Sequence, residues 1–375
     1  MSDSGGTVLH VIVPQREGAI GGSDLHVLDL AVVQQRHGHW RPIILAPRAT
    51  LDYRERLAAA GLTVLPPLRP GWLWRLPSAR GIGMIHGHGY EANYLIVGLR
   101  TLSRGWARPP AVVTAHGWIE NTPSDRVKST LDRLSMRFVD LRIASAQAHH
   151  DRLRAIAEPA VILHNGVPAP SISAEQAAAD GRAFRQRHGI DPNHVLIGSV
   201  GRLSTEKRID LVLQAGARLP TGVHLLVVGG GAQRAELEQM AARLALAGRA
   251  TFTGLLKDVG PALAALDVLL QPSDTEGSPR SVLEAMARGV PVIATDVGDV
   301  RALLDDGRAG ILVPRDDLDA LTRAVRTLID DRGHARALAE RARERYGRLY
   351  TVEMMGAKVH DIYTDAQRAA DGRRR

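Results

Sequence analysis

The chain has 375 residues, of which 45% are hydrophobic and 23% charged, with a formal net charge of +8 and no cysteine. The length exceeds one core of typical size and predicts two domains, and the lack of thiols excludes disulfides, Cys-ligated zinc and cysteine nucleophiles. The positive charge favours anionic partners, whereas an aromatic content of only 4% argues against a base-stacking surface, so we expect no nucleic acid partner.

The basic residues are almost all arginine, with lysine at four positions, a bias that is common in GC-rich bacterial genomes. The N-terminal MSDSGG lacks the charged and apolar regions of a signal peptide, and no apolar run reaches the ~18 residues of a membrane span. We therefore expect a cytoplasmic protein, with peripheral attachment to the inner face of the cytoplasmic membrane left open.

Short apolar runs alternate with longer amphipathic segments in the first part of the chain. The apolar runs lie at 8–13, 42–46, 83–86, 111–116, 141–146 and 160–165. Helix-like segments lie at 23–36, 90–102, 124–139 and 146–156. This alternation is typical of a parallel sheet covered by helices on both faces. It predicts a doubly wound α/β domain over residues 1–167.

Residues 168–192 interrupt the alternation with a Pro-, Ser- and Ala-rich stretch, which we interpret as a linker. A second doubly wound domain is expected over 193–350, and a helix in 351–375 is expected to return to the first domain before a basic tail. The apolar runs of the second domain lie at 194–201, 223–230, 250–254, 267–272, 290–296 and 310–313. Two such domains would place a ligand cleft between the carboxyl ends of their sheets.

Three clusters of glycine or basic residues follow expected strands, where helix N-termini favour anions. Gly21 and Gly22 would let a phosphate approach the backbone, although a plain tight turn would also use them. Arg202 and Lys207 offer two cations to a diphosphate, although such residues are often only solvated. The glycines at 229–231 do not match G-x-G-x-x-G, so we interpret them as a packing feature and expect no hydride transfer.

A fourth cluster, TEGSPRSVLEAMARG at 275–289, has Glu276 in a turn and Glu284 in the following helix. Because the two glutamates are eight positions apart, they would address different parts of an elongated ligand, such as the hydroxyls of a sugar and of a ribose. The backbone amides of Ser278 and Arg280 at the helix start could bind hydroxyls or phosphate. A buried glutamate that is satisfied by backbone or by an arginine is the alternative.

Together these motifs resemble the retaining glycosyltransferases of the GT-B fold, family GT4, over almost the whole chain. The resemblance implies an α/β GT-B fold with two Rossmann-like domains that face a central cleft and with C-terminal helices packed back on the first domain. The matching segments are the glycine pair, TAHGW (114–118), LHNGV (163–167), GRLSTEKRID (201–210), FTG (252–254) and the E-x7-E element EGSPRSVLE (276–284).

The resemblance also implies roles for single residues. Arg202 and Lys207 would neutralise the donor diphosphate, Glu276 would bind the hydroxyls of the donor sugar, and Glu284 would hold the ribose. His116 would point toward the anomeric centre; without the resemblance it would be interpreted as a core histidine. The expected catalytic residues are His116, Arg202, Lys207 and Glu276. The expected donor-binding residues are Gly21, Gly22, Arg202, Lys207, Glu276, Gly277, Ser278, Pro279, Arg280 and Glu284.

Two positions depart from the commoner family pattern. Ser278 stands where an aromatic or large apolar residue often follows Glu-Gly, and Arg280 stands where a small polar residue is frequent. These departures bear on the identity of the donor.

The expected reaction is transfer of a sugar, with retention, from a UDP- or GDP-sugar to a glycan, lipid-linked or polysaccharide acceptor. No Asp-x-Asp element is evident at a strand end in the expected cleft, so we expect catalysis without a metal or other cofactor.

Trp72 and Trp74 could contact a membrane or stack on a sugar, with local packing as the alternative. A nucleotide-sugar 2-epimerase of the same fold and a non-catalytic sugar-nucleotide-binding protein remain open.

Overall fold

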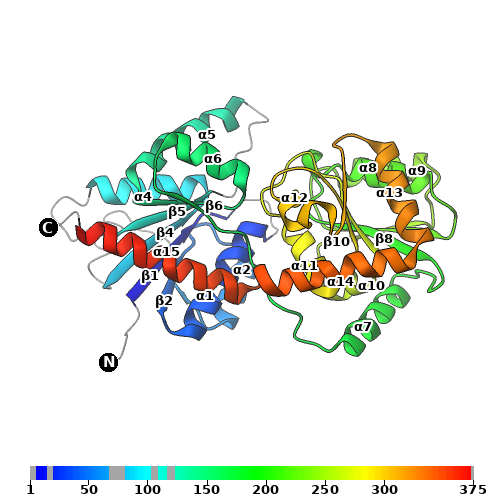
Figure 1. Cartoon of the computed structure of the whole chain (residues 1–375), viewed down its shortest axis with the longest axis horizontal. Coiled ribbons are helices and arrows are strands. Elements are labelled where there is room, and N and C mark those ends of the chain that lie inside the picture. The colour runs from blue at the N-terminus through cyan, green and yellow to red at the C-terminus, as the bar shows by residue number, and fades with distance from the viewer. Residues whose placement is uncertain (1–5, 15–19, 67–80, 103–108, 116–122, 373–375) are drawn as a thin grey trace. The chain divides into compact units, whose positions relative to one another are not determined.

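The structure is a computed structural model that describes residues 6–14, 20–66, 81–102, 109–115 and 123–372. The chain divides into two compact units. Unit 1 comprises Met1–Val167 and Val352–Arg375, and unit 2 comprises Pro168–Thr351. Figure 1 shows helices on both faces of the sheet in each unit, as the alternation of apolar runs and amphipathic segments predicts.

The described part of unit 1 forms a seven-stranded sheet in the order β3-β2-β1-β4-β5-β6-β7, with parallel pairing throughout. Its strands are β1 (Gly6–Ile12), β2 (Trp40–Leu45), β3 (Thr63–Val64), β4 (Ile82–His88), β5 (Ala111–Ala115), β6 (Leu141–Ala144) and β7 (Ala160–Ile162). Its helices are α1 (Gly22–His37), α2 (Leu51–Ala59), α4 (Tyr90–Leu102), α5 (Pro123–Ser135), the 3-10 turn η2 (Met136–Phe138), α6 (Gln147–Ile156) and α15 (Val352–Gly372).

Alternate residues of β1 face opposite sides of this sheet, since side chains alternate along a strand. Leu9 and Val11 belong to an apolar cluster that includes Ile96 of α4. Val8 belongs to a second cluster that is built with α1 and with α15, in which Tyr363 is fully buried. The last helix therefore completes the core of unit 1, which confirms the expectation that the C-terminal helix returns to the first domain.

Unit 2 contains a six-stranded parallel sheet in the order β10-β9-β8-β11-β12-β13. Its strands are β8 (Val195–Val200), β9 (Val223–Val228), β10 (Ala250–Gly254), β11 (Val268–Gln271), β12 (Val292–Thr295) and β13 (Ile311–Val313). Its helices are α7 (Ala174–Arg187), α8 (Ile209–Ala217), α9 (Arg234–Arg243), α10 (Gly260–Ala265), α11 (Arg280–Arg288), α12 (Val300–Leu303), α13 (Leu318–Asp330) and α14 (Arg332–Leu349), with 3-10 turns η3 (Thr205–Lys207) and η4 (Asp305–Gly307).

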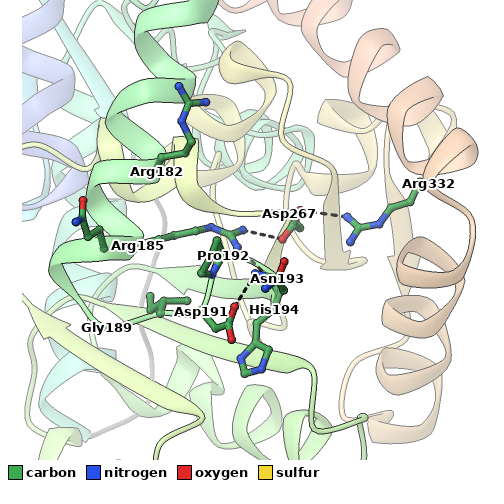
Figure 2. A pocket seen from close by; sticks show the side chains of 11 residues that line it. Arg182, Arg185, Gly189, Asp191, Pro192, Asn193, His194, Asp267 and Arg332 are labelled. Carbon is green, nitrogen blue, oxygen red and sulfur yellow. Dashed lines mark hydrogen bonds and ion pairs between the residues drawn. The ribbon is translucent and has the colours of Figure 1, made fainter.

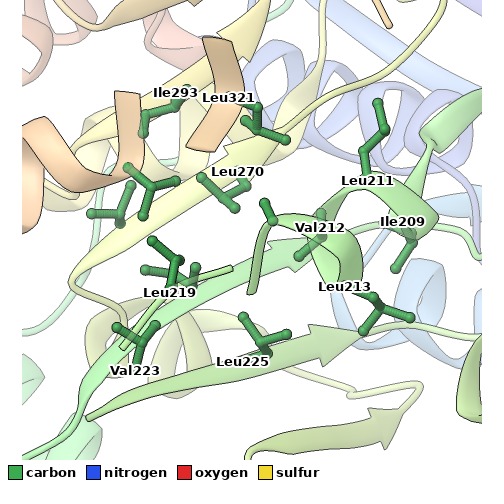
Figure 3. Close-up of a cluster of buried hydrophobic side chains, with 14 of the residues drawn as sticks. Ile209, Leu211, Val212, Leu213, Leu219, Val223, Leu225, Leu270, Ile293 and Leu321 are labelled. Atoms are coloured by element: carbon green, nitrogen blue, oxygen red, sulfur yellow. The ribbon is translucent and has the colours of Figure 1, made fainter. Parts of the chain in front are cut away.

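The main core of unit 2 lies between the sheet and helices α8 and α13. Leu225, Leu270 and Ile293 of three strands pack with Val212 of α8 and Leu321 of α13, and each is at most 1% exposed (Figure 3). Because these strands are buried on both faces, their apolar runs in the sequence are continuous rather than alternating. The two doubly wound domains predicted from the sequence are thus confirmed as parallel-sheet α/β units.

The segment predicted as a linker, 168–192, contains helix α7, which belongs to unit 2. Phe184 is buried, and Arg185 donates to the carbonyl of Ala265 in α10. At Gly181 a Cβ would lie 2.6 Å from the carbonyl oxygen of Ala264, so the two helices meet backbone to backbone. The Ala-rich sequence does not predict this docking, because the contact depends on the close approach of two helix backbones and not on a wide apolar face.

None of the described helices combines the length and the apolarity that crossing a bilayer requires.

Candidate functional site

The polar clusters of unit 2 meet at the carboxyl edge of its sheet. The backbone amide of Asp274, after β11, donates to the carbonyl of Glu206, after β8, over 2.8 Å. The loop after β12 joins them, since Asp299 donates its amide to the carbonyl of Gly277 over 2.9 Å. Ligands of open α/β sheets bind at this edge. The structure therefore brings the second and fourth sequence clusters together.

Glu276 is the centre of this arrangement. Its carboxylate accepts from Lys207 Nζ over 2.7 and 2.9 Å, from Gln271 Nε2 over 2.6 Å and from Ser273 Oγ over 2.6 Å. The Glu276 side chain is only 7% exposed. A buried carboxylate needs such partners, because its desolvation is costly without a counter-charge and hydrogen bonds. Ser281 of α11 donates to Gln271 and fixes the orientation of that amide.

Sequence reasoning missed Gln271 and Ser273. Gln271 ends β11 after three apolar residues, and Ser273 follows two positions later. A polar residue at the carboxyl end of a central apolar strand is the signal that could have found Gln271. Ser273 has no comparable signal, because serine is common in any turn.

The backbone around Glu276 requires glycine at position 298. Gly298 has φ +58, and a Cβ there would lie 1.9 Å from the carbonyl oxygen of Glu276. The turn at Glu276 and Gly277 thus rests directly on the loop after β12. The position of the Glu276 carboxylate is set by contacts that are remote in the sequence.

Arg202 lies on the more exposed side of the same edge. Its guanidinium pairs with Glu206 over 3.2 Å, and Ser204 Oγ donates to the same carboxylate over 2.7 Å. Burial by itself would raise the pKa of Glu206, but the hydrogen bond from Ser204 and two nearby cations lower it below its usual value. Glu206, which sequence reasoning did not single out, is therefore a carboxylate held beside the two predicted cations.

Glu284 has a different partner from Glu276. It pairs with Arg280 over 3.4 Å, one turn away on α11, and both side chains are largely buried. This is the arginine contact that the sequence offers as the alternative to ligand binding. Pro279 occupies the N-cap position of α11, so Gly277, Ser278 and Pro279 form the turn that leads from Glu276 into the helix.

The three glycines after β9 support the loop that carries the cations. Gly229 and Gly231 have φ values of +139 and +154, and a Cβ on them would lie 1.8 Å from Gly201 O and 2.3 Å from Leu203 O. Leu203 also donates its amide to the carbonyl of Gly230 over 2.8 Å. These close backbone contacts agree with the interpretation of the glycines as a packing feature.

In unit 1, Gly21 and Gly22 lie where α1 begins. The amide of Gly21 donates to the carboxylate of Asp24 over 2.8 Å, and Tyr53 donates to the carbonyl of Asp24. Burial raises the pKa of Asp24, and the hydrogen bond from Gly21 opposes that effect. At the turn where Gly21 and Gly22 are predicted to admit a phosphate, the backbone amide of Gly21 is therefore bonded to a carboxylate. His116, Trp72 and Trp74 lie outside the described residues.

A cavity of about 890 Å³ lies at the opposite, amino-terminal edge of the unit 2 sheet (Figure 2). Asp267, just before β11, pairs there with Arg185 over 2.8 Å and with Arg332 over 3.1 Å. Arg185 also donates to the carbonyl of His194. These contacts fasten α7 and α14 to the sheet, so the arginines at this cavity have a structural role.

Comparison with known proteins places these features in a family. The model of "Glycosyl transferases group 1" matches residues 180–345, and the model of "Glycosyltransferase Family 4" matches residues 20–169. The two matches cover the larger part of both sheets and the site described above. The chain therefore belongs to the GT-B glycosyltransferases of family GT4.

Curated relatives match over part of their length. The chain is 36% identical over 118 residues to "Lipopolysaccharide core biosynthesis glycosyltransferase LpsE" of Rhizobium meliloti, covering 32% of this chain and 34% of that protein. It is 32% identical over 180 residues to "GDP-mannose-dependent alpha-mannosyltransferase" of Mycobacterium tuberculosis, covering 48% and 45%. The chain thus spans less than half the length of these relatives.

Solved structures show the same fold over nearly the whole chain. HepE of Anabaena, in complex with UDP-glucose, has a TM-score of 0.81 at 22% identity and covers 96% of this chain and 99% of that structure. WaaG, a glycosyltransferase of lipopolysaccharide biosynthesis, has a TM-score of 0.73 at 18% identity, with 95% and 99% covered. At these identities the likeness establishes the GT-B fold.

Proposed function

We propose that this chain is a retaining glycosyltransferase that moves a sugar from a nucleoside-diphosphate sugar to a glycan or lipid-linked acceptor. The observation that carries the proposal is the buried Glu276 carboxylate, held by Lys207 and Gln271 at the carboxyl edge of a parallel sheet. A carboxylate with fixed donors can orient sugar hydroxyls, and the adjacent cation can meet a phosphate.

The bound donor would replace the ion-pair partners that these charged side chains have within the protein. When the diphosphate arrives, Lys207 and Arg202 would turn from Glu276 and Glu206 toward the phosphate oxygens and stabilise the charge of the leaving group. The freed Glu276 carboxylate would then accept hydrogen bonds from the sugar. Glu284 would hold the ribose, and Gly22 of unit 1 would approach the phosphates.

Two further features of the reaction belong to the proposal. Two cations and the backbone amides at the start of α11 can stabilise a leaving diphosphate without a metal ion, so we propose metal-independent transfer. UDP-glucose in the HepE structure and the name of the GDP-mannose-dependent relative support a UDP- or GDP-sugar donor.

We further propose a lipid-linked glycan at the cytoplasmic face of a membrane as the acceptor. The names of LpsE and WaaG, which refer to lipopolysaccharide, support this class of acceptor. The net charge of +8 suits an acceptor that carries phosphate.

Release of nucleoside diphosphate from UDP-, GDP-, ADP- and dTDP-sugars, with and without EDTA, tests this function. We expect slow, EDTA-resistant release from one donor, lost in Glu276→Gln and in Arg202→Ala and retained in Arg323→Ala, which changes an exposed arginine on α13. Epimerisation of the donor without release would favour the epimerase. Donor binding with neither reaction would favour the non-catalytic protein.

A further inference from the structure

Helix α5 of unit 1 carries an exposed apolar stripe. Among the described residues eight large hydrophobic side chains are strongly exposed, and four of these lie within α5 and η2. They are Val127, Leu131, Leu134 and Phe138, with exposures of 58, 51, 48 and 60%. The spacing of four and three positions places Val127, Leu131 and Leu134 on one face of α5, and Phe138 follows in the 3-10 turn η2. We call these four residues the α5 stripe.

The opposite face of α5 is polar although it is buried. Ser129, Asp132 and Ser135 are at most 8% exposed. Asp132 accepts from Asn93 of α4 over 2.8 Å, and Tyr94 of α4 donates to the carbonyl of Lys128 over 2.6 Å. Rotating α5 to bury the stripe would break both hydrogen bonds and separate the Asp132 carboxylate from Asn93, so specific contacts hold the apolar face outward.

The surface beside the α5 stripe is basic. Arg126, Lys128 and Arg137 are exposed, while Asp132, the one carboxylate among the described side chains of this segment, is buried. Figure 1 shows α5 on the outer side of α6, and α5 packs against α4 and α6. An apolar face flanked by cations matches the interface of an anionic bilayer, where apolar side chains enter the acyl boundary and cations stay with the headgroups.

We propose that the α5 stripe docks unit 1 on a membrane that contains anionic phospholipids. This docking would give the enzyme access to a lipid-linked acceptor, so the inference deepens the proposed function and rests on it. The geometry suits that use: α5 begins at Pro123, eight positions after β5 ends at Ala115, at the carboxyl edge of the unit 1 sheet. The docking surface and the edge where ligands bind are therefore close along the chain.

Sedimentation with vesicles tests the proposal. The full chain is mixed with vesicles of phosphatidylcholine alone, or of phosphatidylcholine and phosphatidylglycerol in equal amounts. We expect binding to the anionic vesicles only, weakened by added salt, and at least about tenfold weaker for the double variant Leu131→Glu/Leu134→Glu. The double variant Arg126→Glu/Arg137→Glu should lose binding to anionic vesicles to a similar degree.

The matched control is Leu51→Glu, which changes a leucine on α2 that is 73% exposed and should leave vesicle binding unchanged. Because all these side chains are exposed, circular dichroism should show folded protein in each case. Equal binding by wild type and by Leu131→Glu/Leu134→Glu, or no binding by wild type, would overturn the proposal. A wild-type dimer that the same variant converts to a monomer, without vesicle binding, would assign the stripe to a second copy of the chain.

Release of nucleoside diphosphate from a soluble donor, measured without vesicles, separates this proposal from the proposed function. Release that persists in Leu131→Glu/Leu134→Glu while vesicle binding is lost supports both. Vesicle binding by a wild-type protein that releases no diphosphate would refute the transferase and leave the docking surface standing.

Discussion

Lys207 holds both carboxylate oxygens of Glu276, at 2.7 and 2.9 Å, across 69 positions of the sequence. The pair joins the loop after β8 to the loop after β11, and it keeps a cation and an anion in place at the edge where ligands of open α/β sheets bind. In the state described here each charge therefore neutralises the other.

Replacing Lys207 by Met should remove this compensation. Glu276 would remain 7% exposed with hydrogen bonds but no counter-charge, and we expect the free energy of unfolding of unit 2 to fall by about 2 kcal/mol, less than for fully buried pairs because Lys207 is 21% exposed. Diphosphate release should fall more than about 100-fold. Urea unfolding followed by circular dichroism, together with the release assay, measures both effects.

Glu276→Gln is the matched variant for the other partner. It keeps the shape of the side chain and removes the charge, so we expect a smaller loss of stability than in Lys207→Met but a comparable loss of release. Unchanged release in Glu276→Gln would show that this carboxylate does not bind the donor sugar.

Gly298→Ala should displace the turn that carries Glu276. The added Cβ would meet the Glu276 carbonyl oxygen at 1.9 Å, at a φ of +58 that alanine adopts only with strain, so we expect a loss of about 2–4 kcal/mol and greatly reduced release. Gly307→Ala is the control, since φ is +90 there but nothing lies within 4 Å of the added Cβ. It should cost about 1 kcal/mol and leave release intact. Equal effects of the two changes would contradict a role for this contact.

The sequence predicted the two sheets and the edge of unit 2 where polar residues gather, because parallel strands read as continuous apolar runs and ligands bind at their carboxyl ends. It did not predict which side chains meet there. Gln271 and Glu206 contact the predicted residues only because strand register and loop packing bring them together. No local sequence pattern encodes that arrangement. Helix α7 was not predicted because its docking depends on the close approach at Gly181 rather than on an apolar face. The α5 stripe was not predicted because an amphipathic pattern predicts a buried apolar face, whereas the apolar face of α5 is exposed.

Arg208 links three loops at this edge. It adopts the left-handed conformation with φ +51, which is unfavourable for a non-glycine residue. Its guanidinium pairs with Asp210 over 3.1 Å, with Asp274 over 3.2 Å and with Asp316. We expect the ion pairs to offset the backbone strain and to hold Lys207, the preceding residue, against Glu276.

Arg208→Gly should therefore relieve strain and still weaken the site. We expect Arg208→Ala to lower the free energy of unfolding by about 1–2 kcal/mol and Arg208→Gly by about 1 kcal/mol less, with a higher KM for the donor in both. The control Arg218→Ala breaks an exposed pair with Asp319 and should change neither quantity. A KM that Arg208→Gly leaves at the wild-type value would show that the three carboxylates do not position Lys207.

His10 should make unit 1 sensitive to acid. It is fully buried on β1, where it bonds His88 of β4 over 3.0 Å and Gln34 of α1 over 2.8 Å, and the rings of His86 and His88 lie beside it. Burial lowers the pKa of His10 to about 4, and the hydrogen bond to Gln34 opposes that shift. The unfolded chain, with a histidine pKa of about 6.5, then binds more protons than the native unit between these values.

Stability from this group is therefore fully present above pH ~6.5 and is lost as the pH falls toward 4, by up to about 3 kcal/mol. Hydrogen exchange of the amides of β1 and β4, measured at several pH values and corrected for intrinsic rates, reports on unit 1 alone. His10→Gln should flatten the dependence, whereas His334→Gln, at an exposed position of α14, should not. Protection of β1 that stays constant from pH 7 to 4.5 in the wild type would mean that the pKa of His10 is not lowered in the native unit.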